Sequence, residues 1–303
     1  MDLANFDKIT MNLEDKEQIL RPSMGYWKDS FRRFKENKIA VVLTIYIIIL
    51  FFGSILVPVF SSYSISDQEL MKQNLSIGEE GHIFGTDGFG RDIFVRVWYG
   101  ARISLFIAFV AAFVDLIIGV LYGGISGYFG GKVDQIMTRI IDVIQAIPFM
   151  IFAILLAAIL EPGIFTIIIA YAILGWTNMA RQVRGLVLQI KNQEYVLAAR
   201  VLGANSRRIM YKHIFPNVIG IVVVTMTLTI PSAMFTEAFL SYIGLGVPLP
   251  QASWGTLASD AAGTFISYPS QLFIPAIFIS LTILSFNLIG DALRDALDPK
   301  LRK

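Results

Sequence analysis

Long apolar stretches alternate with polar segments along this chain. Each apolar stretch approaches the roughly 20 residues that a helix needs to cross about 30 Å of hydrocarbon. The apolar residues run continuously and do not alternate with polar ones, which favours helices over a membrane β-barrel. We therefore expect an all-α integral membrane protein with six transmembrane helices, at residues 39–60, 103–124, 140–160, 163–180, 218–240 and 271–290.

The composition agrees with a membrane protein and excludes several other classes. Hydrophobic residues make up 55% of the 303 residues and charged residues only 16%, which is too apolar for a soluble globule of this length. The net charge is only +2 and the basic residues flank the apolar stretches, so we expect no nucleic-acid binding. Cysteine is absent, which excludes disulfides and thiol chemistry.

The distribution of basic residues predicts the orientation. With six spans, all but four of the 25 Lys and Arg residues fall on one side of the membrane. The positive-inside rule then places both termini in the cytoplasm of a multi-pass protein of the cell (cytoplasmic or inner) membrane. The polar start of the chain argues against a cleaved secretory signal.

The chain therefore divides into five predicted segments. Residues 1–38 form a basic amphipathic segment on the inner surface of the membrane lipid, and 39–60 the first transmembrane helix. Residues 61–102 form an extracytoplasmic loop. Residues 103–290 form a five-helix core containing a cytoplasmic loop at 182–217, and 291–303 a cytoplasmic tail.

The cytoplasmic loop is a charged island between two apolar stretches, and it is predicted to offer a docking surface to another protein. Good helix formers between Gln182 and Leu202 predict one helix there. Gly203 is suited to the left-handed conformation that ends a helix, and Asn205 or Ser206 to capping a second one.

This second helix is expected to carry a basic face and an apolar face and to meet the first at an angle. Arg207 and Arg208 form the basic face, Ile214 belongs to the apolar face, and Pro216 is expected to end the helix at the membrane surface.

The loop resembles the cytoplasmic signature of the membrane permease subunits of ABC importers. That signature reads Glu-Ala-Ala, three residues, Gly, nine residues, Ile, one residue, Leu-Pro. The chain matches it at Ala198, Ala199, Gly203 and Pro216, with Ile214 close to the family's spacing. It departs from the signature at Leu197 and Phe215, where the family has Glu and Leu. The residues that the resemblance assigns to contact with an ATPase are Glu194, Ala198, Ala199, Gly203, Ala204, Asn205, Ser206, Arg207, Arg208, Ile214 and Pro216.

Further motifs narrow the resemblance to the C-type permeases of peptide and nickel importers. They are His82-Ile-Phe-Gly85-Thr-Asp87, Gly90-Arg91-Asp92, Gly100-Ala-Arg102-Ile-Ser104-Leu, Gly244-Leu-Gly246, Ser253-Trp254-Gly255 and the run from Asn287 to Pro299. The resemblance implies a type I permease fold and a subunit of an ATP-driven importer of oligopeptides or dipeptides. Its implied partners are a homologous B-type permease, two cytoplasmic ATP-binding subunits and an extracytoplasmic solute-binding protein.

The same resemblance implies no cofactor and no catalytic residue in this chain, because partner ATPases hold ATP and Mg²⁺. The run Gly130-Gly131-Lys132-Val133 lacks both the hydroxyl residue after Lys and the first Gly of a phosphate-binding loop. The two histidines, His82 and His213, fall on opposite sides of the membrane in this topology, so no metal site uses both.

Three residues are candidates for lining a substrate path: Asp115, Pro148 and Met234. A charge in the middle of a span costs about 2.5 to 3.5 kcal/mol on insertion scales, so Asp115 lines a path, relays protons or pairs with a polar group of the neighbouring permease. Pro148 marks a kink that lines a cavity or affects packing alone. Met234 suits an adaptable surface or an ordinary core. Glu237 is expected at the membrane interface.

Four residues of the outer segments are candidates for docking the solute-binding protein: Asp87, Arg91, Asp92 and Trp254. The alternative for Arg91 and Asp92 is a salt-bridged turn.

Other functions stay open at this stage. A nickel or other small-solute importer shares the permease motifs. An ion-coupled secondary transporter fits Asp115 and the broken helices, although it needs more buried titratable groups than the sequence offers. An intramembrane enzyme needs paired catalytic groups at membrane depth, and no such pair occurs in neighbouring apolar stretches.

Overall fold

The computed structural model describes residues 25–297, and within that range the chain is helical apart from loops and one isolated bridge between Thr86 and Asp92. The predictions for residues 1–24 and 298–303 lie outside the described residues. The principal helices are α2 (Tyr26–Glu36), α3 (Lys38–Phe60), α4 (Ile93–Val114), α5 (Val120–Phe129), α6 (Gly131–Gln145), α7 (Phe149–Leu160), α8 (Ile164–Ala170), α9 (Thr177–Ile190), α10 (Glu194–Val201), α11 (Ser206–Ile209), α12 (Phe215–Tyr242), α13 (Trp254–Ala262) and α14 (Pro269–Leu297). Three π-helical turns, η3 (Asp115–Gly119), η4 (Tyr171–Gly175) and η5 (Met210–Ile214), join helices end to end, and two short 3₁₀ turns, η1 (Leu70–Lys72) and η2 (Glu79–Gly81), lie in the outer loop.

Within the described residues, five continuous helices are long and apolar enough to cross a membrane, and a bent pair makes a sixth span. The five are Lys38–Phe60, Ile93–Phe129, Ile164–Ile190, Ser206–Tyr242 and Pro269–Leu297. The all-α, six-span prediction is therefore confirmed when the bent pair, α6 with α7, counts as one span.

The second span begins at Ile93 and not at residue 103, so the expected boundary of the outer loop at 102 is wrong. The Asp92 side chain accepts a hydrogen bond from the Val95 amide at 2.7 Å and caps the helix there. Because Arg96 and Arg102 interrupt the hydrophobic pattern in the first turns, hydropathy alone places the helix start too late.

The third span is broken, whereas the sequence predicts one helix at 140–160 with a kink at Pro148. α6 and α7 meet at 73°, with Pro148 at the N-cap of α7 in an extended conformation. Proline has no N–H to donate, and it disfavours helical geometry in the residue before it. Pro148 is exposed and marks a break in the span instead of a kink inside it.

Only some of the glycines between residues 123 and 131 belong to the turn after the second span. Gly123 and Gly127 lie inside α5, where a Cβ at Gly123 would come within 2.3 Å of the Ala180 carbonyl oxygen on α9. Small residues of this kind let membrane helices approach closely. Only Gly130 and Gly131, with φ of 66° and 53°, make the turn itself.

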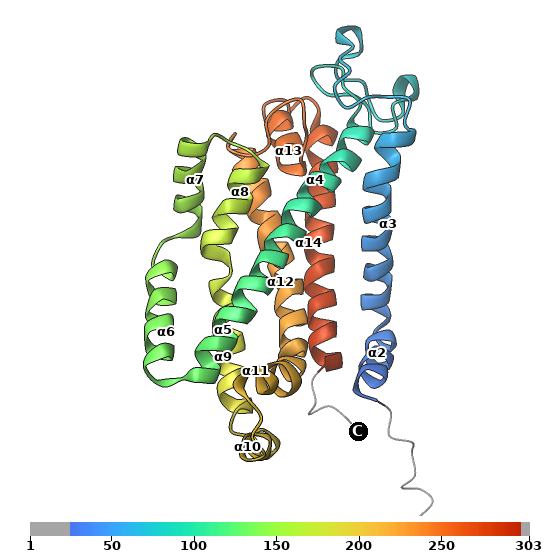
Figure 1. The fold of residues 1–303 in the computed structure, drawn as a ribbon. Helices are drawn as coiled ribbons and strands as arrows, with labels where there is room; N and C mark the ends of the chain where they lie inside the picture. Colours follow the sequence, from blue (N-terminus) through green and yellow to red (C-terminus); the bar gives the residue numbers. More distant parts are fainter. Residues whose placement is uncertain (1–24, 298–303) are drawn as a thin grey trace, which may run out of the picture.

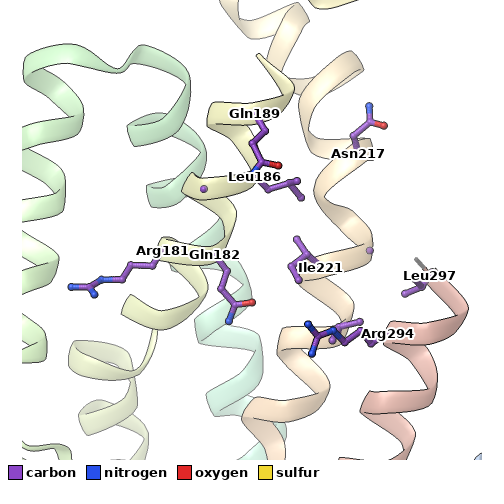
Figure 2. A pocket seen from close by; sticks show the side chains of 11 residues that line it. Arg181, Gln182, Leu186, Gln189, Asn217, Ile221, Arg294 and Leu297 are labelled. Carbon is purple, nitrogen blue, oxygen red and sulfur yellow. The ribbon is translucent and has the colours of Figure 1, made fainter. Parts of the chain in front are cut away.

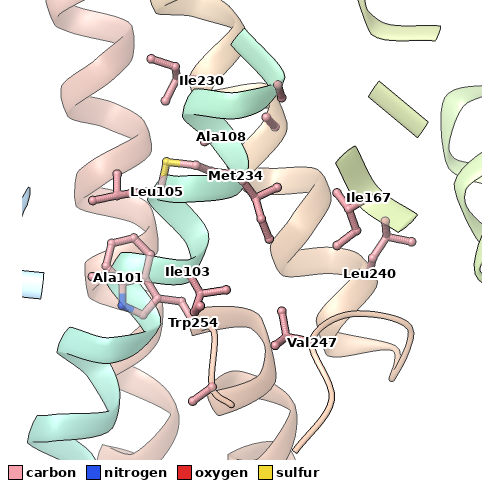
Figure 3. Close-up of a cluster of buried hydrophobic side chains, with 14 of the residues drawn as sticks. Ala101, Ile103, Leu105, Ala108, Ile167, Ile230, Met234, Leu240, Val247 and Trp254 are labelled. Atoms are coloured by element: carbon pink, nitrogen blue, oxygen red, sulfur yellow. The ribbon is translucent and has the colours of Figure 1, made fainter. Parts of the chain in front are cut away.

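The main hydrophobic core lies where α4, α12, α13 and α14 meet (Figure 3). Trp254 at the start of α13 is 1% exposed and its indole N–H donates to the Val97 carbonyl at 2.9 Å. Met234 of α12 is also 1% exposed and packs among the same side chains.

The two ends of the bundle carry different elements (Figure 1). α2, α10, α11 and the end of α14 lie at one end, and the outer loop with α13 lies at the other. α3 packs on α4 and α14 at one side of the bundle. The predicted cytoplasmic loop and the predicted extracytoplasmic loop are thus on opposite ends of the molecule.

Candidate functional site

The elbow is the segment 194–217, in which α10 and α11 project from the end of the bundle (Figure 1). The single helix predicted from Gln182 to Leu202 is wrong, because α9 ends at Ile190 and α10 begins at Glu194. The Lys191 ammonium donates to the Gly127 carbonyl at 2.7 Å, and the Asn192 amide donates to the Leu188 carbonyl at 3.2 Å. These side-chain bonds end α9 and turn the chain into α10.

The turn between α10 and α11 has the conformation expected from the sequence. Gly203 has φ of 83°, and its amide donates to the Arg200 carbonyl at 3.0 Å. The Asn205 side chain accepts a hydrogen bond from the Arg208 amide at 2.8 Å and caps α11. A Cβ at position 203 would meet nothing within 4 Å, so the backbone angle is what favours glycine here.

Pro216 does not end the second helix, which corrects the prediction. α11, η5 and α12 form one continuous helix from Ser206 to Tyr242, and Pro216 lies in the first turn of α12. The π-helical turn just before Pro216 changes the local hydrogen-bond register, so the helix continues past a residue without an N–H. The elbow therefore leads directly into a membrane-spanning helix.

A buried apolar cluster fastens the elbow to the two helices that flank it. Val196, Ile209 and Ile214 are at most 1% exposed and pack with α9 side chains such as Val183 and α12 side chains such as Val218. Ile214, expected to contact an ATPase, instead holds the elbow from within. A force on the elbow would reach both α9 and α12 through these contacts.

The outward face of the elbow contains most of the predicted contact residues. Glu194, Ala198, Gly203, Asn205, Ser206, Arg207, Arg208 and Pro216 are exposed, while Ala199 and Ala204 are half-buried. Two further residues, missed by the motif comparison, are the most exposed large hydrophobic side chains of the elbow: Val201 at 86% and Leu202 at 87%. Apolar side chains on an otherwise charged loop were the available signal, because such patches mark interaction sites.

Tyr195 also lies on the elbow, and it is partly exposed. Burial of part of the ring raises the pKa of its phenol above the ordinary value of 10.0. The phenol therefore stays neutral at physiological pH and adds no negative charge to the elbow.

Asp115 is one of the three residues that the sequence predicts to line a substrate path. It is 4% exposed and lies in η3, where the Thr229 hydroxyl of α12 donates to its Oδ2 at 3.2 Å. Its other oxygen, Oδ1, has no hydrogen-bond partner within the described residues. Gly175 leaves room for this oxygen, since a Cβ there would lie 2.9 Å from Oδ1. Pro148 and Met234 do not join Asp115: the first is at the span break and the second is in the core.

Glu237 is not interfacial, as the sequence suggested, but fully buried near the outer end of α12. The hydroxyls of Ser104 and Ser241 each donate to its carboxylate at 2.7 Å. Ser104 lies on α4, so the carboxylate joins the two packed helices. Nearby, the Ser253 hydroxyl donates to that of Ser241 at 3.3 Å and links the loop before α13 to this group.

The four residues predicted to dock a binding protein are all buried and hold the outer loop together. The Arg91 guanidinium donates to Asp87 at 2.6 Å and to Asp260 of α13 at 2.8 Å. Asp92, besides capping α4, lies 2.8 Å from the His82 ring. The salt-bridged turn is thus present, and docking stays a prediction for the surface around it because side chains this buried offer no contact area.

We expect Arg91→Ala to loosen the outer loop. Removing one partner of a buried ion pair costs about 3 to 5 kcal/mol because the other charge is left uncompensated. Limited proteolysis should then cleave between residues 61 and 92 markedly faster than in the wild-type protein. The matched control is Arg102→Ala, since Arg102 is exposed and lies 4.6 Å above the Tyr99 ring. Equal cleavage of both variants would contradict the role of Arg91 in holding the outer loop together.

The fold and the elbow define a class: a helical membrane permease with a protruding loop at one end. Comparison with known proteins agrees. Residues 116–303 match the family described as binding-protein-dependent transport system inner membrane component, and residues 25–76 match the N-terminal TM domain of oligopeptide transport permease C. The chain belongs to the binding-protein-dependent transport system inner membrane component family.

Relatives match along almost the whole length. The chain is 54% identical over 298 residues to the oligopeptide transport system permease protein OppC of Bacillus subtilis (strain 168), covering 98% of this chain and 97% of that protein. It is 49% identical to the dipeptide transport system permease protein DppC of the same strain, covering 95% of this chain and 90% of that protein. A chain from an inward-facing structure of the MetNI methionine ABC transporter has the same fold, with a TM-score of 0.56 and 18% identity, over 68% of this chain and 96% of that one.

Proposed function

We propose that this chain is the permease subunit of an ATP-driven importer of oligopeptides or dipeptides. The oligopeptide and dipeptide permeases among its relatives favour peptides over nickel or another small solute. Its partners in this proposal are a homologous second permease, two cytoplasmic ATP-binding subunits and an extracytoplasmic solute-binding protein. ATP and Mg²⁺ bind to the ATPases, and this chain converts their movement into opening and closing of the pathway.

One observation carries the coupling role: the elbow presents Val201 and Leu202 to the outside while Val196, Ile209 and Ile214 anchor it to α9 and α12. An exposed apolar tip flanked by charges is typical of a protein interface. Because α11 continues without interruption into α12, a displacement of the tip moves a membrane-spanning helix. Rigid-body motion of packed elements is a common form of conformational switching.

The exposure pattern of α2 supports placing the end of the bundle that carries the elbow at the cytoplasmic membrane surface. Its polar Asp29 and Ser30 are buried, while the side chains of Trp27 and Phe31 are 56% and 59% exposed. A helix surrounded by water would expose its polar side chains and bury its aromatic ones, which is the reverse of this arrangement. The arrangement suits a helix whose aromatic face enters the lipid interface. Because the basic segments of the chain share this end, the positive-inside rule favours the cytoplasmic side.

The proposal predicts that Val201→Asp combined with Leu202→Asp releases the ATPase subunits. Two charges at the centre of an apolar contact would be desolvated without partners, which costs several kcal/mol in binding. Co-purification of the ATPases with this chain should fall by about tenfold or more. The control is Ile266→Asp, because Ile266 is 96% exposed but lies at the other end of the molecule. Undiminished co-purification in the double variant would overturn the coupling role of the tip.

Transport itself tests the class of the protein. The reconstituted complex, supplied with ATP and with no ion gradient, should accumulate a radiolabelled peptide. Uptake that needs an ion gradient and ignores ATP would instead support the secondary transporter.

A further inference from the structure

A groove of about 530 Å³ lies between α9, α12 and the last turns of α14, at the same end of the bundle as the elbow (Figure 2). This volume is within the range of roughly 300 to 1,000 Å³ that is typical of small-ligand sites. The groove lies between the two helices that flank the elbow. The function described above does not use it, nor does it use the motif around Arg294 at the end of α14.

Among the described residues of the lining, one cation has no carboxylate partner. Arg294 extends from α14 across the groove toward α12 (Figure 2). Within the described residues no carboxylate lies within 4.0 Å of its guanidinium, so it makes no salt bridge there. Arg181, the other arginine of the lining, points away toward α6 and pairs with Asp142 at 2.6 Å. Arg294 is therefore the positive charge that the groove offers.

Amide groups and apolar side chains complete the lining. The Gln182 side-chain oxygen accepts a hydrogen bond from the Thr225 hydroxyl at 2.8 Å, which leaves its NH₂ group to donate to a ligand. The Asn217 NH₂ group donates to the His213 carbonyl at 2.6 Å, which leaves its oxygen to accept. Leu186 and Ile221 provide apolar walls, and at Gly185 an added Cβ would meet nothing within 4 Å, so space is open there.

This combination fits a short peptide with a free carboxyl terminus. A guanidinium binds a carboxylate through paired, charge-assisted hydrogen bonds, the amides suit peptide N–H and C=O groups, and the apolar walls suit side chains. We infer that the groove is a cytoplasmic-end subsite for peptide cargo, in which Arg294 binds the C-terminal carboxylate. The inference rests on the proposed import of peptides.

Peptide binding at the groove can be measured without transport. Because the chain has no cysteine, Ile221→Cys gives this subunit a unique attachment point for a bimane fluorophore. The subunit is labelled before assembly with its partners, and the importer is held in phosphatidylcholine nanodiscs. Tryptophan quenches bimane on contact, so the probe is the tripeptide Ala-Ala-Trp with a free carboxylate, compared with its C-terminal amide. A label at Ile266→Cys, at a residue that is 96% exposed at the other end of the molecule, is the control for non-specific quenching.

The free acid should quench at a concentration about tenfold lower than the amide, because its carboxylate makes charge-assisted hydrogen bonds to Arg294, which solvent weakens at this exposed side chain. Arg294→Gln should remove this difference by weakening the free acid alone, and Arg294→Lys should restore part of it. Equal quenching by acid and amide, an equal effect at position 266, or no effect of Arg294→Gln would each overturn the inference. Displacement of both peptides alike by added phosphatidylglycerol would assign the groove to lipid and also overturn it.

Peptide uptake by the same importer reconstituted in proteoliposomes separates this inference from the proposed function. ATP-driven uptake together with a failed quenching test removes the subsite alone, whereas absence of uptake removes the importer proposal.

Discussion

Gly203→Pro should abolish coupled peptide uptake while the chain still inserts and assembles. Proline fixes φ near −65°, whereas Gly203 has φ of 83°, and proline also removes the amide that donates to the Arg200 carbonyl. The angle between α10 and α11 then changes. We expect uptake to fall about tenfold or more, given a local cost on the order of 3 kcal/mol. The measurement is peptide transported per ATP hydrolysed in proteoliposomes.

Two variants make this result specific to the elbow. Gly203→Ala keeps the amide and pays only the left-handed cost of about 1 to 2 kcal/mol, so its defect should be smaller. Gly78→Pro is a matched control, because Gly78 has φ of 81°, donates its amide to the His82 carbonyl and lies in the outer loop. If Gly78→Pro lowered the peptide-to-ATP ratio as much as Gly203→Pro, the elbow would have no special role in coupling.

Trp254→Ala should destabilise the protein strongly. The side chain is 1% exposed, packs in the core of α4, α12 and α14, and donates a hydrogen bond to the Val97 carbonyl. Truncating a buried tryptophan to alanine costs about 3 to 5 kcal/mol through lost contacts and the cavity left behind. The detergent-solubilised variant should lose its monodisperse peak on heating at a clearly lower temperature than the wild-type protein does.

The comparison for this prediction is Trp27→Ala, which removes the same side chain where it is 56% exposed. Its thermal shift should be small. A Trp254→Ala protein as heat-stable as the wild type would show that the start of α13 is not part of the core, and would also restore Trp254 as a candidate surface residue for docking.

The parts of the fold that hydropathy predicts are those in which apolar residues face lipid. α3, α12 and α14 appear where the sequence places them, because their exposed faces must be continuously apolar. The start of α4 was missed for the opposite reason: Arg96 is buried by the outer loop, where it donates to the Ile65 carbonyl at 2.9 Å and lies near Asp87 and Asp260. A charge satisfied by distant residues is not distinguishable in sequence from a charge in a loop.

In the functional site, too, features that depend on neighbouring residues could be predicted, and features that depend on distant residues could not. The left-handed Gly203 and the Asn205 cap depend on neighbouring residues, so they were predictable. The end of α9 depends on Lys191 reaching α5, and the burial of Glu237 depends on Ser104 of α4. Such contacts between distant segments leave no local pattern, which is why Glu237 was expected at the interface.

The most direct test of the central claim is a site-specific cross-link from the elbow in the intact assembly. In this cysteine-free chain, Val201→Cys carrying a short thiol-reactive photo-cross-linker should capture an ATPase subunit, and an impermeant thiol reagent should reach position 201 only from the cytoplasmic side. Met71→Cys, at a residue 98% exposed in the outer loop, should react only from outside and capture no ATPase. Labelling of position 201 from outside, or capture of no ATPase there, would contradict the account.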